Sequence, residues 1–231
     1  MSPALQQAFA LLPNYLASHL LVSLAALLLG AAISLPLAVL ASRNATLRWP
    51  LLAFASFIQT IPSLALLALF YPVLLALSTL TRSTLGVGFP ALGFLPSLLA
   101  LTLYSMLPML RNTVTGLAGV DPASVEAARG VGMTDRQRLT LVELPLAAPV
   151  IMAGVRTAAV LAIGTATLAA FVGGGGLGDP IVAGLALADA RMVLSGAIPA
   201  ALMALAVDGV LAAVERRATP VAMRARGRRN G

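Results

Sequence analysis

The chain has 231 residues and a formal net charge of +7; 59% of its residues are hydrophobic and 10% are charged. A soluble domain carries about a quarter charged residues, so this composition excludes an ordinary soluble protein and indicates one that is solvated mostly by lipid. Lysine and cysteine are absent from the sequence, which excludes Schiff-base chemistry, disulfides, thiolate metal sites and nucleophilic thiols.

Five apolar segments are long enough to cross a hydrocarbon core about 30 Å thick, which takes roughly 20 helical residues. The sequence therefore predicts an all-α polytopic membrane protein, with residues 1–214 as one transmembrane domain and an arginine-rich tail at 215–231. No cleavable signal peptide is expected, because the first apolar segment is too long and no basic region precedes it. The five predicted spans lie near 16–41, 51–78, 91–110, 147–172 and 192–214.

Arginines crowd the connections on one side of the predicted membrane. Twelve of them fall in the first loop, the third loop and the tail, against Arg82 and Arg191 on the opposite side. The positive-inside rule therefore predicts a cytoplasmic C-terminus, and the odd number of spans predicts an N-terminus outside. Since these arginines follow the spans and are not interleaved with stacking aromatics, membrane orientation explains the basic charge and no nucleic acid partner is expected.

A helix break is expected inside the second predicted span, where Gln59, Thr60 and Ser63 flank Pro62. Proline removes a backbone donor from a helix, and polar side chains beside such a break often line a water-filled path through the membrane. These four residues are therefore candidates for a translocation pathway. The alternative is a kink that serves only helix packing.

Residues 121–145 form the third loop and contain regular signals for helix starts and stops. Asp121 followed by Pro122 predicts an N-cap and the first residue of a short helix. Gly130 and Gly132 are suited to end that helix. The positive-inside rule predicts that this loop lies in the cytoplasm.

A second short helix is expected directly afterwards. Thr134 with Gln137 three residues later makes a capping box, and Pro145 is expected to stop the helix. Two short helices joined by a glycine turn make a compact unit, which we call the knuckle (residues 121–145). Its mixture of charges suits a docking surface for a soluble partner, although a polar loop that merely solvates the cytoplasmic face is the alternative.

Arg156 and Asp208 lie inside the fourth and fifth predicted spans. At 1.5 Å per residue, both are expected roughly 10 Å inside the cytoplasmic boundary. An unpaired charge at that depth costs on the order of 3 kcal/mol, so the two side chains are expected to form a buried ion pair. The alternative is that Arg156 extends to the headgroups while Asp208 caps a neighbouring backbone.

A glycine-rich stretch follows the fourth span and is expected at the outer mouth. A phosphate-binding loop would need a lysine at its end, which the chain lacks, so this stretch is expected to act as a gate or receptor-docking loop, or simply as a turn. A short helix is expected at 181–190, and His19 near the outer end of the first span is expected to be an interfacial residue. The glycines are Gly173, Gly174, Gly175, Gly176 and Gly178.

The knuckle contains the spacing Glu-Ala-Ala, three residues, Gly, nine residues, Val-Glu-Leu-Pro. This pattern resembles the EAA loop of the membrane subunits of type I ATP-binding cassette importers, which usually has Ile where Val142 stands. In that family the loop forms coupling helices that seat in a cleft on each ATPase subunit. The residues to which the resemblance gives an ATPase-coupling role are Glu126, Ala127, Ala128, Gly132, Leu144 and Pro145.

Four further stretches resemble the permeases of osmoprotectant importers, which move glycine betaine, choline, carnitine and related quaternary amines. They are the segments 59–67, 110–122, 153–160 and 172–179. The resemblance implies a multi-pass subunit in the cytoplasmic (inner) membrane of a prokaryote, without enzymatic activity or a cofactor of its own. It also implies three kinds of partner: cassette ATPase subunits that bind ATP and Mg²⁺, a second permease copy or paralogue, and an extracytoplasmic binding protein.

Other functions fit the sequence less well. A permease for another small solute, such as an amino acid, has the same architecture. A channel or an ion-coupled carrier should show acidic or polar residues near the bilayer centre, and few are found. A membrane enzyme would need clustered His, Asp or Glu near one interface, whereas eight acidic residues and one histidine are scattered along this chain.

Overall fold

The computed structural model describes residues 3–218, in which the regular secondary structure is all helical and no β-strand is found. The all-α prediction is confirmed for the described residues. In chain order the elements are α1 (Pro3–Arg43), α2 (Ala45–Thr60), α3 (Ser63–Leu85), α4 (Phe94–Ala118), α5 (Pro122–Gly130), α6 (Asp135–Arg138), a π segment (Leu139–Glu143), α7 (Leu144–Ala166), a 3-10 segment (Thr167–Val172), α8 (Gly178–Ala186) and α9 (Ala190–Ala218).

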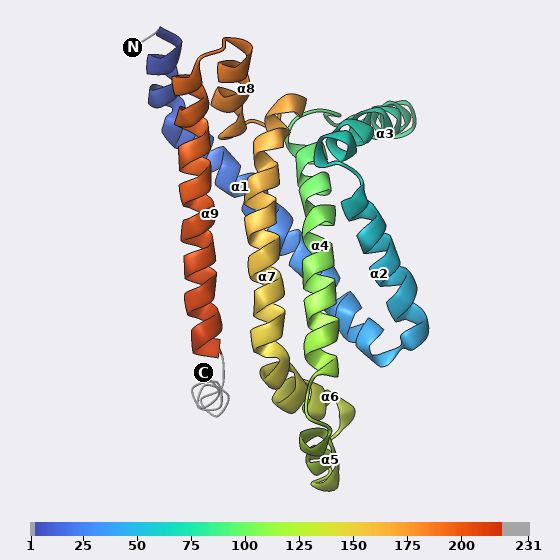
Figure 1. Ribbon diagram of the computed structural model, residues 1–231. Helices are drawn as coiled ribbons and strands as arrows, with labels where there is room; N and C mark the ends of the chain where they lie inside the picture. Colours follow the sequence, from blue (N-terminus) through green and yellow to red (C-terminus); the bar gives the residue numbers. More distant parts are fainter. Residues whose placement is uncertain (1–2, 219–231) are drawn as a thin grey trace.

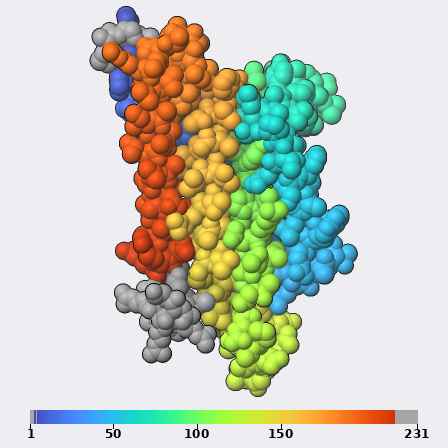
Figure 2. Space-filling model, viewed as in Figure 1, coloured from blue at the N-terminus to red at the C-terminus, as the bar shows by residue number. Residues whose placement is uncertain are grey.

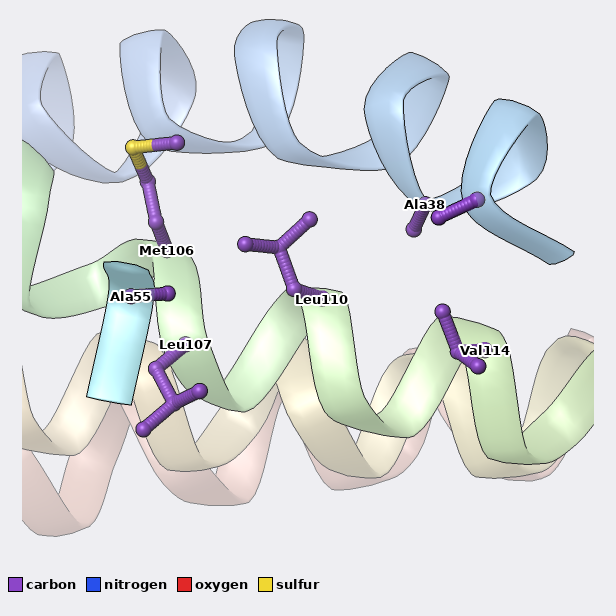
Figure 3. Packing of buried hydrophobic residues seen from close by; sticks show 7 residues of the cluster. Ala38, Ala55, Met106, Leu107, Leu110 and Val114 are labelled. Carbon is purple, nitrogen blue, oxygen red and sulfur yellow. The ribbon is translucent and has the colours of Figure 1, made fainter. Parts of the chain in front are cut away.

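Helix α4 lies at the centre of the bundle, in contact with α1, α2 and α7 (Figure 1). Its sequence is apolar or small on most sides, which is the pattern of a helix surrounded by other helices. Figure 3 shows part of this packing, in which Leu107 and Leu110 of α4 lie near Ala38 of α1 and Ala55 of α2. Because small residues face larger ones, the helices approach closely and gain van der Waals contacts, which drive association where lipid is as apolar as the protein.

Five helical segments within the described range are long and apolar enough to cross a membrane, as predicted. They are α1, α3, α4, the continuous run 135–172 and α9. Several helices extend beyond the predicted spans, because a helix continues through polar residues where its apolar run ends. Arg111, for example, was predicted in a connection but lies inside α4.

The second predicted span, 51–78, is wrong as a single crossing segment, whereas the helix break predicted inside it is confirmed. Helix α2 ends at Thr60, Ile61 and Pro62 are extended, and α3 starts at Ser63. A proline disfavours helical geometry in the residue before it as well as removing its own donor, so the chain changes direction at this dipeptide. Figure 1 shows α3 turned away from the axis of α2.

The two ends of the bundle hold different elements. The start of α1 lies at one end with α3 and α8, whereas the α1–α2 turn, the knuckle and the end of α9 lie at the other (Figure 1). The arginine-rich connections therefore share one end, and Figure 2 shows the knuckle protruding beyond the helices there. The predicted tail, 215–231, lies outside the described residues from position 219 onward.

Candidate functional site

The knuckle begins with a capped helix. The Asp121 side chain accepts a hydrogen bond from the Ala123 amide at 3.0 Å, and Pro122 is the first residue of α5. Asp121 thus satisfies an amide that has no partner within the helix. The predicted start of this helix is confirmed, and so is its end, because α5 stops at Gly130.

Gly132 is required by the backbone geometry that closes α5. The Met133 amide bonds to the Ala128 carbonyl at 3.1 Å, and the Gly132 amide bonds to the Arg129 carbonyl at 2.9 Å. These two bonds form a Schellman motif, which needs a left-handed residue between them, and Gly132 has φ +79°. A side chain at this position would meet open space, so the conformation and not the available volume selects glycine.

The second short helix starts with the predicted capping box. The Gln137 amide donates to the Thr134 hydroxyl at 3.3 Å, and the Gln137 side chain accepts from the Thr134 amide at 2.9 Å. Two amides at the helix start are thereby satisfied in a reciprocal way. Together with the glycine turn, this box fixes the direction in which the chain leaves α5.

Pro145 does not end the second helix, contrary to the prediction. Helix α6 continues through the π segment directly into α7, where Pro145 is the second residue. In a regular α-helix a proline ring presses on the carbonyl four residues earlier. Here the turn just before Pro145 is widened, because the Leu144 amide bonds to the Leu139 carbonyl five residues back. The wider turn accommodates the proline ring.

The residues of the Glu-Ala-Ala and Leu-Pro pattern divide between an outer and an inner face of the knuckle. The exposed ones are Glu126, Ala127, Gly132 and Pro145. Ala128 is buried, and Leu144 packs against Leu117 and Ala147 at the base of the knuckle. Val131, between the two short helices, is 75% exposed. The knuckle therefore presents an apolar residue and several polar groups outward while it is braced from within.

A charged cluster at the base of the knuckle was not predicted. The Glu143 carboxylate accepts hydrogen bonds from Arg43 at the end of α1 and from Arg138 Nε at 2.9 Å, and Arg138 also pairs with Asp135 at 2.8 Å. Arg138 and Glu143 are buried. The available signal was a glutamate placed between apolar residues, but the partner 100 positions away in the sequence could not be chosen from sequence alone.

Arg156 and Asp208 meet in the structure, bridging α7 and α9. The guanidinium donates from Nε and Nη2 to the two Asp208 oxygens, both at 3.0 Å, and from Nη1 to Glu215 Oε2 at 2.8 Å. A two-point contact of this kind fixes the relative orientation of the two groups. Glu215 was missed in the sequence, although it lies seven residues after Asp208 and therefore on the same face of α9.

The candidate pathway residues surround the break between α2 and α3. Gln59 donates from Nε2 to the Tyr104 carbonyl at 2.9 Å, and the Tyr104 hydroxyl donates in turn to the Ile61 carbonyl. These bonds tie the broken helix to α4. Thr60 and Pro62 are exposed, whereas Gln59 and Ser63 are half-buried.

The glycine-rich stretch forms a tight loop between the 3-10 segment and α8. Gly173, Gly175 and Gly176 have positive φ angles. Gly174 and Gly178 have ordinary φ angles but no room for a side chain; at Gly178 an added Cβ would overlap the Thr167 carbonyl oxygen. The helix that follows covers Gly178–Ala186 and not the expected 181–190.

His19 is a buried clamp and not the interfacial residue that the sequence predicted. Its Nε2 donates to the Ile163 carbonyl of α7 at 3.0 Å, and its Nδ1 accepts from the Leu177 amide of the glycine-rich loop at 3.3 Å. The two bonds require a neutral ring protonated on Nε2. His19 thus joins α1, α7 and the loop, an arrangement that a single histidine in an apolar run does not indicate.

The acidic residues do not form a metal site in the described range. Among residues 3–218, no group of three His, Asp or Glu side chains lies close enough to hold a metal ion. Asp179, in the first turn of α8, is half-buried, and this burial raises the pKa of its carboxyl. Desolvation disfavours the charged form of an acid, so Asp179 stays protonated to a higher pH than a solvated aspartate.

Similar proteins are found among characterised permeases. The chain is 45% identical over 205 residues to the choline transport system permease protein OpuBB of Bacillus subtilis, covering 89% of this chain and 87% of the relative. It is 44% identical over 202 residues to the glycine betaine/carnitine/choline transport system permease protein OpuCB of the same organism, covering 87% and 86%. It is 41% identical over 215 residues to the osmoprotectant import permease protein OsmW of Salmonella typhimurium, covering 91% and 95%.

Solved structures of importers share the fold. An inward-facing structure of the MetNI methionine ABC transporter matches with a TM-score of 0.77 at 20% identity, covering 95% of this chain and all of that one. A crystal structure of an amino acid ABC transporter with histidines matches with a TM-score of 0.71 at 21% identity, covering 91% and 95%. Residues 26–220 match the sequence family of binding-protein-dependent transport system inner membrane components. The chain belongs to this family of ABC importer permeases.

Proposed function

We propose that this chain is the membrane-spanning subunit of an ATP-driven importer and forms, with a second permease copy or paralogue, the pathway for a quaternary-amine osmoprotectant. The observation that carries this proposal is the 41–45% identity, over nearly the whole length, to permeases named for choline, glycine betaine, carnitine and osmoprotectant import. The protein lies in the cytoplasmic (inner) membrane of a prokaryote. Its N-terminus is outside, and its arginine-rich tail and knuckle are in the cytoplasm.

The knuckle seats on a cassette ATPase subunit, which binds ATP and Mg²⁺. Three features of the described residues support this role: the knuckle protrudes beyond the bundle, it holds its shape through caps at both short helices, and it exposes both Glu126 and Val131. A rigid protrusion transmits a displacement, whereas a loose loop would absorb it. Glu126, Ala127, Ala128 and Gly132 shape the contact, while Leu144 and Pro145 join it to α7.

Transport follows from a difference in contacts between two states. When ATP closes the ATPase subunits, the knuckle is displaced, and the spans turn so that the pathway opens toward the binding protein outside. A ligand shifts such an equilibrium only by the difference in its affinity for the two states, so the free energy comes from the ATPase. The glycine-rich loop at 173–178 serves as the outer gate or docking loop, and Gln59, Thr60, Pro62 and Ser63 line the path.

Uptake by the reconstituted importer tests this function. The permease is placed in liposomes with its cassette ATPase and the cognate binding protein, and uptake of labelled choline, glycine betaine, carnitine and methionine is followed with and without internal ATP. ATP-dependent uptake of one or more of the three amines is the expected result. Uptake of methionine alone would show that the protein belongs to an amino-acid importer. Amine uptake without ATP would show that it is an ion-coupled carrier.

A further inference from the structure

Four charged side chains join the knuckle to the corner between α1 and α2. They are Arg43, Asp135, Arg138 and Glu143. We propose that Glu143 is a positioning residue for coupling: it locks the knuckle to this corner, so that a displacement of the knuckle moves α1, α2 and α7 as one body. This inference rests on the proposed function of the knuckle.

The contacts of Glu143 leave neither oxygen of its carboxylate free. Oε2 accepts from Arg43 Nη2, and Oε1 accepts from Arg138 Nε at 2.9 Å. The side chains of Arg138 and Glu143 are 7% and 6% exposed, whereas that of Arg43 is 42% exposed. A buried carboxylate held from two elements has one favourable position, because losing either partner leaves an uncompensated charge. Glu143 therefore fixes the distance between α1 and the knuckle.

The π segment is what brings Glu143 and Arg138 together. In an α-helix each residue turns by 100°, so two residues five apart point about 140° away from each other. The five residues from Leu139 to Glu143 form a wider turn, in which the Leu144 amide bonds to the Leu139 carbonyl. Side chains five apart then lie on nearly the same face. Single π turns inside α-helices occur frequently at functional sites, and this one serves the contact with Arg138.

The corner held by Glu143 leads directly to the candidate pathway. Arg43 is the last residue of α1, and the next residue, Asn44, caps α2 by accepting from the Thr46 amide at 2.9 Å. One residue thus separates the two helices, and little slack remains between them. The far end of α2 carries Gln59 and Thr60 beside the helix break. A continuous series of helices and bonds therefore runs from the knuckle through Arg43 to the break.

Solute imported per ATP hydrolysed tests this role in the complete reconstituted complex. Glu143→Gln keeps the size of the side chain but removes its charge, and we expect about a tenfold fall in this ratio, within the range of typical coupling free energies. The ATPase should still copurify and hydrolyse ATP. Arg43→Gln should cause a similar fall, whereas Arg43→Lys should keep most of the wild-type ratio. The double variant with Gln at both positions should be no worse than either single variant, because both changes act through one contact.

Ser56→Ala is the matched control. It removes the hydrogen bond from Arg111 that joins α4 to α2 without touching the knuckle, and it should leave the ratio unchanged. The inference is overturned if Glu143→Gln and Arg43→Gln both import as much solute per ATP as the wild type, or if the partly exposed Arg43→Gln variant fails to assemble, since the contact would then serve folding alone. Failure of the wild-type complex to import any amine would instead refute the proposed function.

Discussion

The knuckle and the glycine-rich loop lie at opposite ends of the bundle and are stabilised in different ways. In the knuckle, most of the bonds that define the shape join residues two to five positions apart, as at Asp121 and Thr134. In the glycine-rich loop, the defining contacts join distant segments, as when His19 bonds to Ile163 and Leu177. One end is built from local signals, and the other depends on the packing of the whole bundle.

Because of this difference, variants at the two ends should affect transport and stability to different degrees. A change in a local cap alters the shape of the knuckle but leaves the bundle packed, so it should impair transport more than folding. A change in a long-range contact at the glycine-rich loop removes bonds between three elements, so it should lower the free energy of unfolding of the whole domain. Variants in the knuckle should therefore mainly reduce transport, whereas variants at the glycine-rich loop should mainly reduce stability.

The largest loss of stability is expected from His19→Ala. The ring is fully buried, and its removal leaves a cavity and strands the Ile163 carbonyl and the Leu177 amide without partners. Cavity formation and the loss of buried bonds together should cost about 4 kcal/mol. Thermal unfolding of the purified permease in detergent measures this loss, at roughly 2–4 °C per kcal/mol for a chain of this size.

Ser18→Ala provides the control for the histidine. The Ser18 hydroxyl bonds only to carbonyls of its own helix in the described range, at Asn14 and Tyr15, so its loss should change the melting temperature little. A His19→Ala protein with the same melting temperature as the wild type would contradict the view that the end with the glycine-rich loop depends on long-range contacts.

Gly178→Ala should be the next most damaging change. An added Cβ would overlap the Thr167 carbonyl and would lie 2.9 Å from the Ala170 Cβ. Backbone cannot move aside as easily as a flexible side chain, so the overpacking should cost about 3 kcal/mol. The comparison variant is Gly164→Ala on α7, where nothing lies within 4 Å of the new Cβ; it should be neutral or slightly stabilising, since alanine favours helix. Equal melting temperatures for the two variants would remove the packing explanation.

The sequence predicted most of what depends on neighbouring residues. The number of apolar spans, the start of α5 and the capping box at Thr134 all follow from patterns within a few positions. The meeting of Arg156 and Asp208 was expected as well, because helix length fixes the depth of a charge and a buried charge needs a partner. These features require no knowledge of which helices touch.

The features that the sequence analysis missed depend on which helices are in contact. The contact between Arg43 and Glu143 joins residues 100 positions apart, and the burial of His19 depends on where a glycine-rich loop is placed. Pro145 illustrates a different limit, because a proline predicts a helix end unless the preceding turn widens. The widened turn carries Glu143, whose contact with Arg43 is again long-range.

Gly132→Ala should have the smallest effect on stability and a large one on transport. The left-handed backbone at Gly132 costs an alanine about 1–2 kcal/mol, and this cost falls on the knuckle alone, because a Cβ there meets no neighbour. The strained turn shifts toward other conformations and misaligns α5 with α6. ATP-dependent uptake should fall about tenfold in liposomes that contain a normal amount of inserted protein.

Gly130→Ala isolates the cause, since the two glycines differ in one respect. Both positions have open space for a side chain, but the left-handed φ belongs to Gly132 and not to Gly130, which ends α5. An alanine at 130 is therefore compatible with the helix and should leave uptake near the wild-type level. Equal uptake by both variants would mean that the shape of the turn is unimportant for coupling. A loss in the Gly132 variant alone would show that the local geometry of the knuckle controls transport independently of the stability of the bundle.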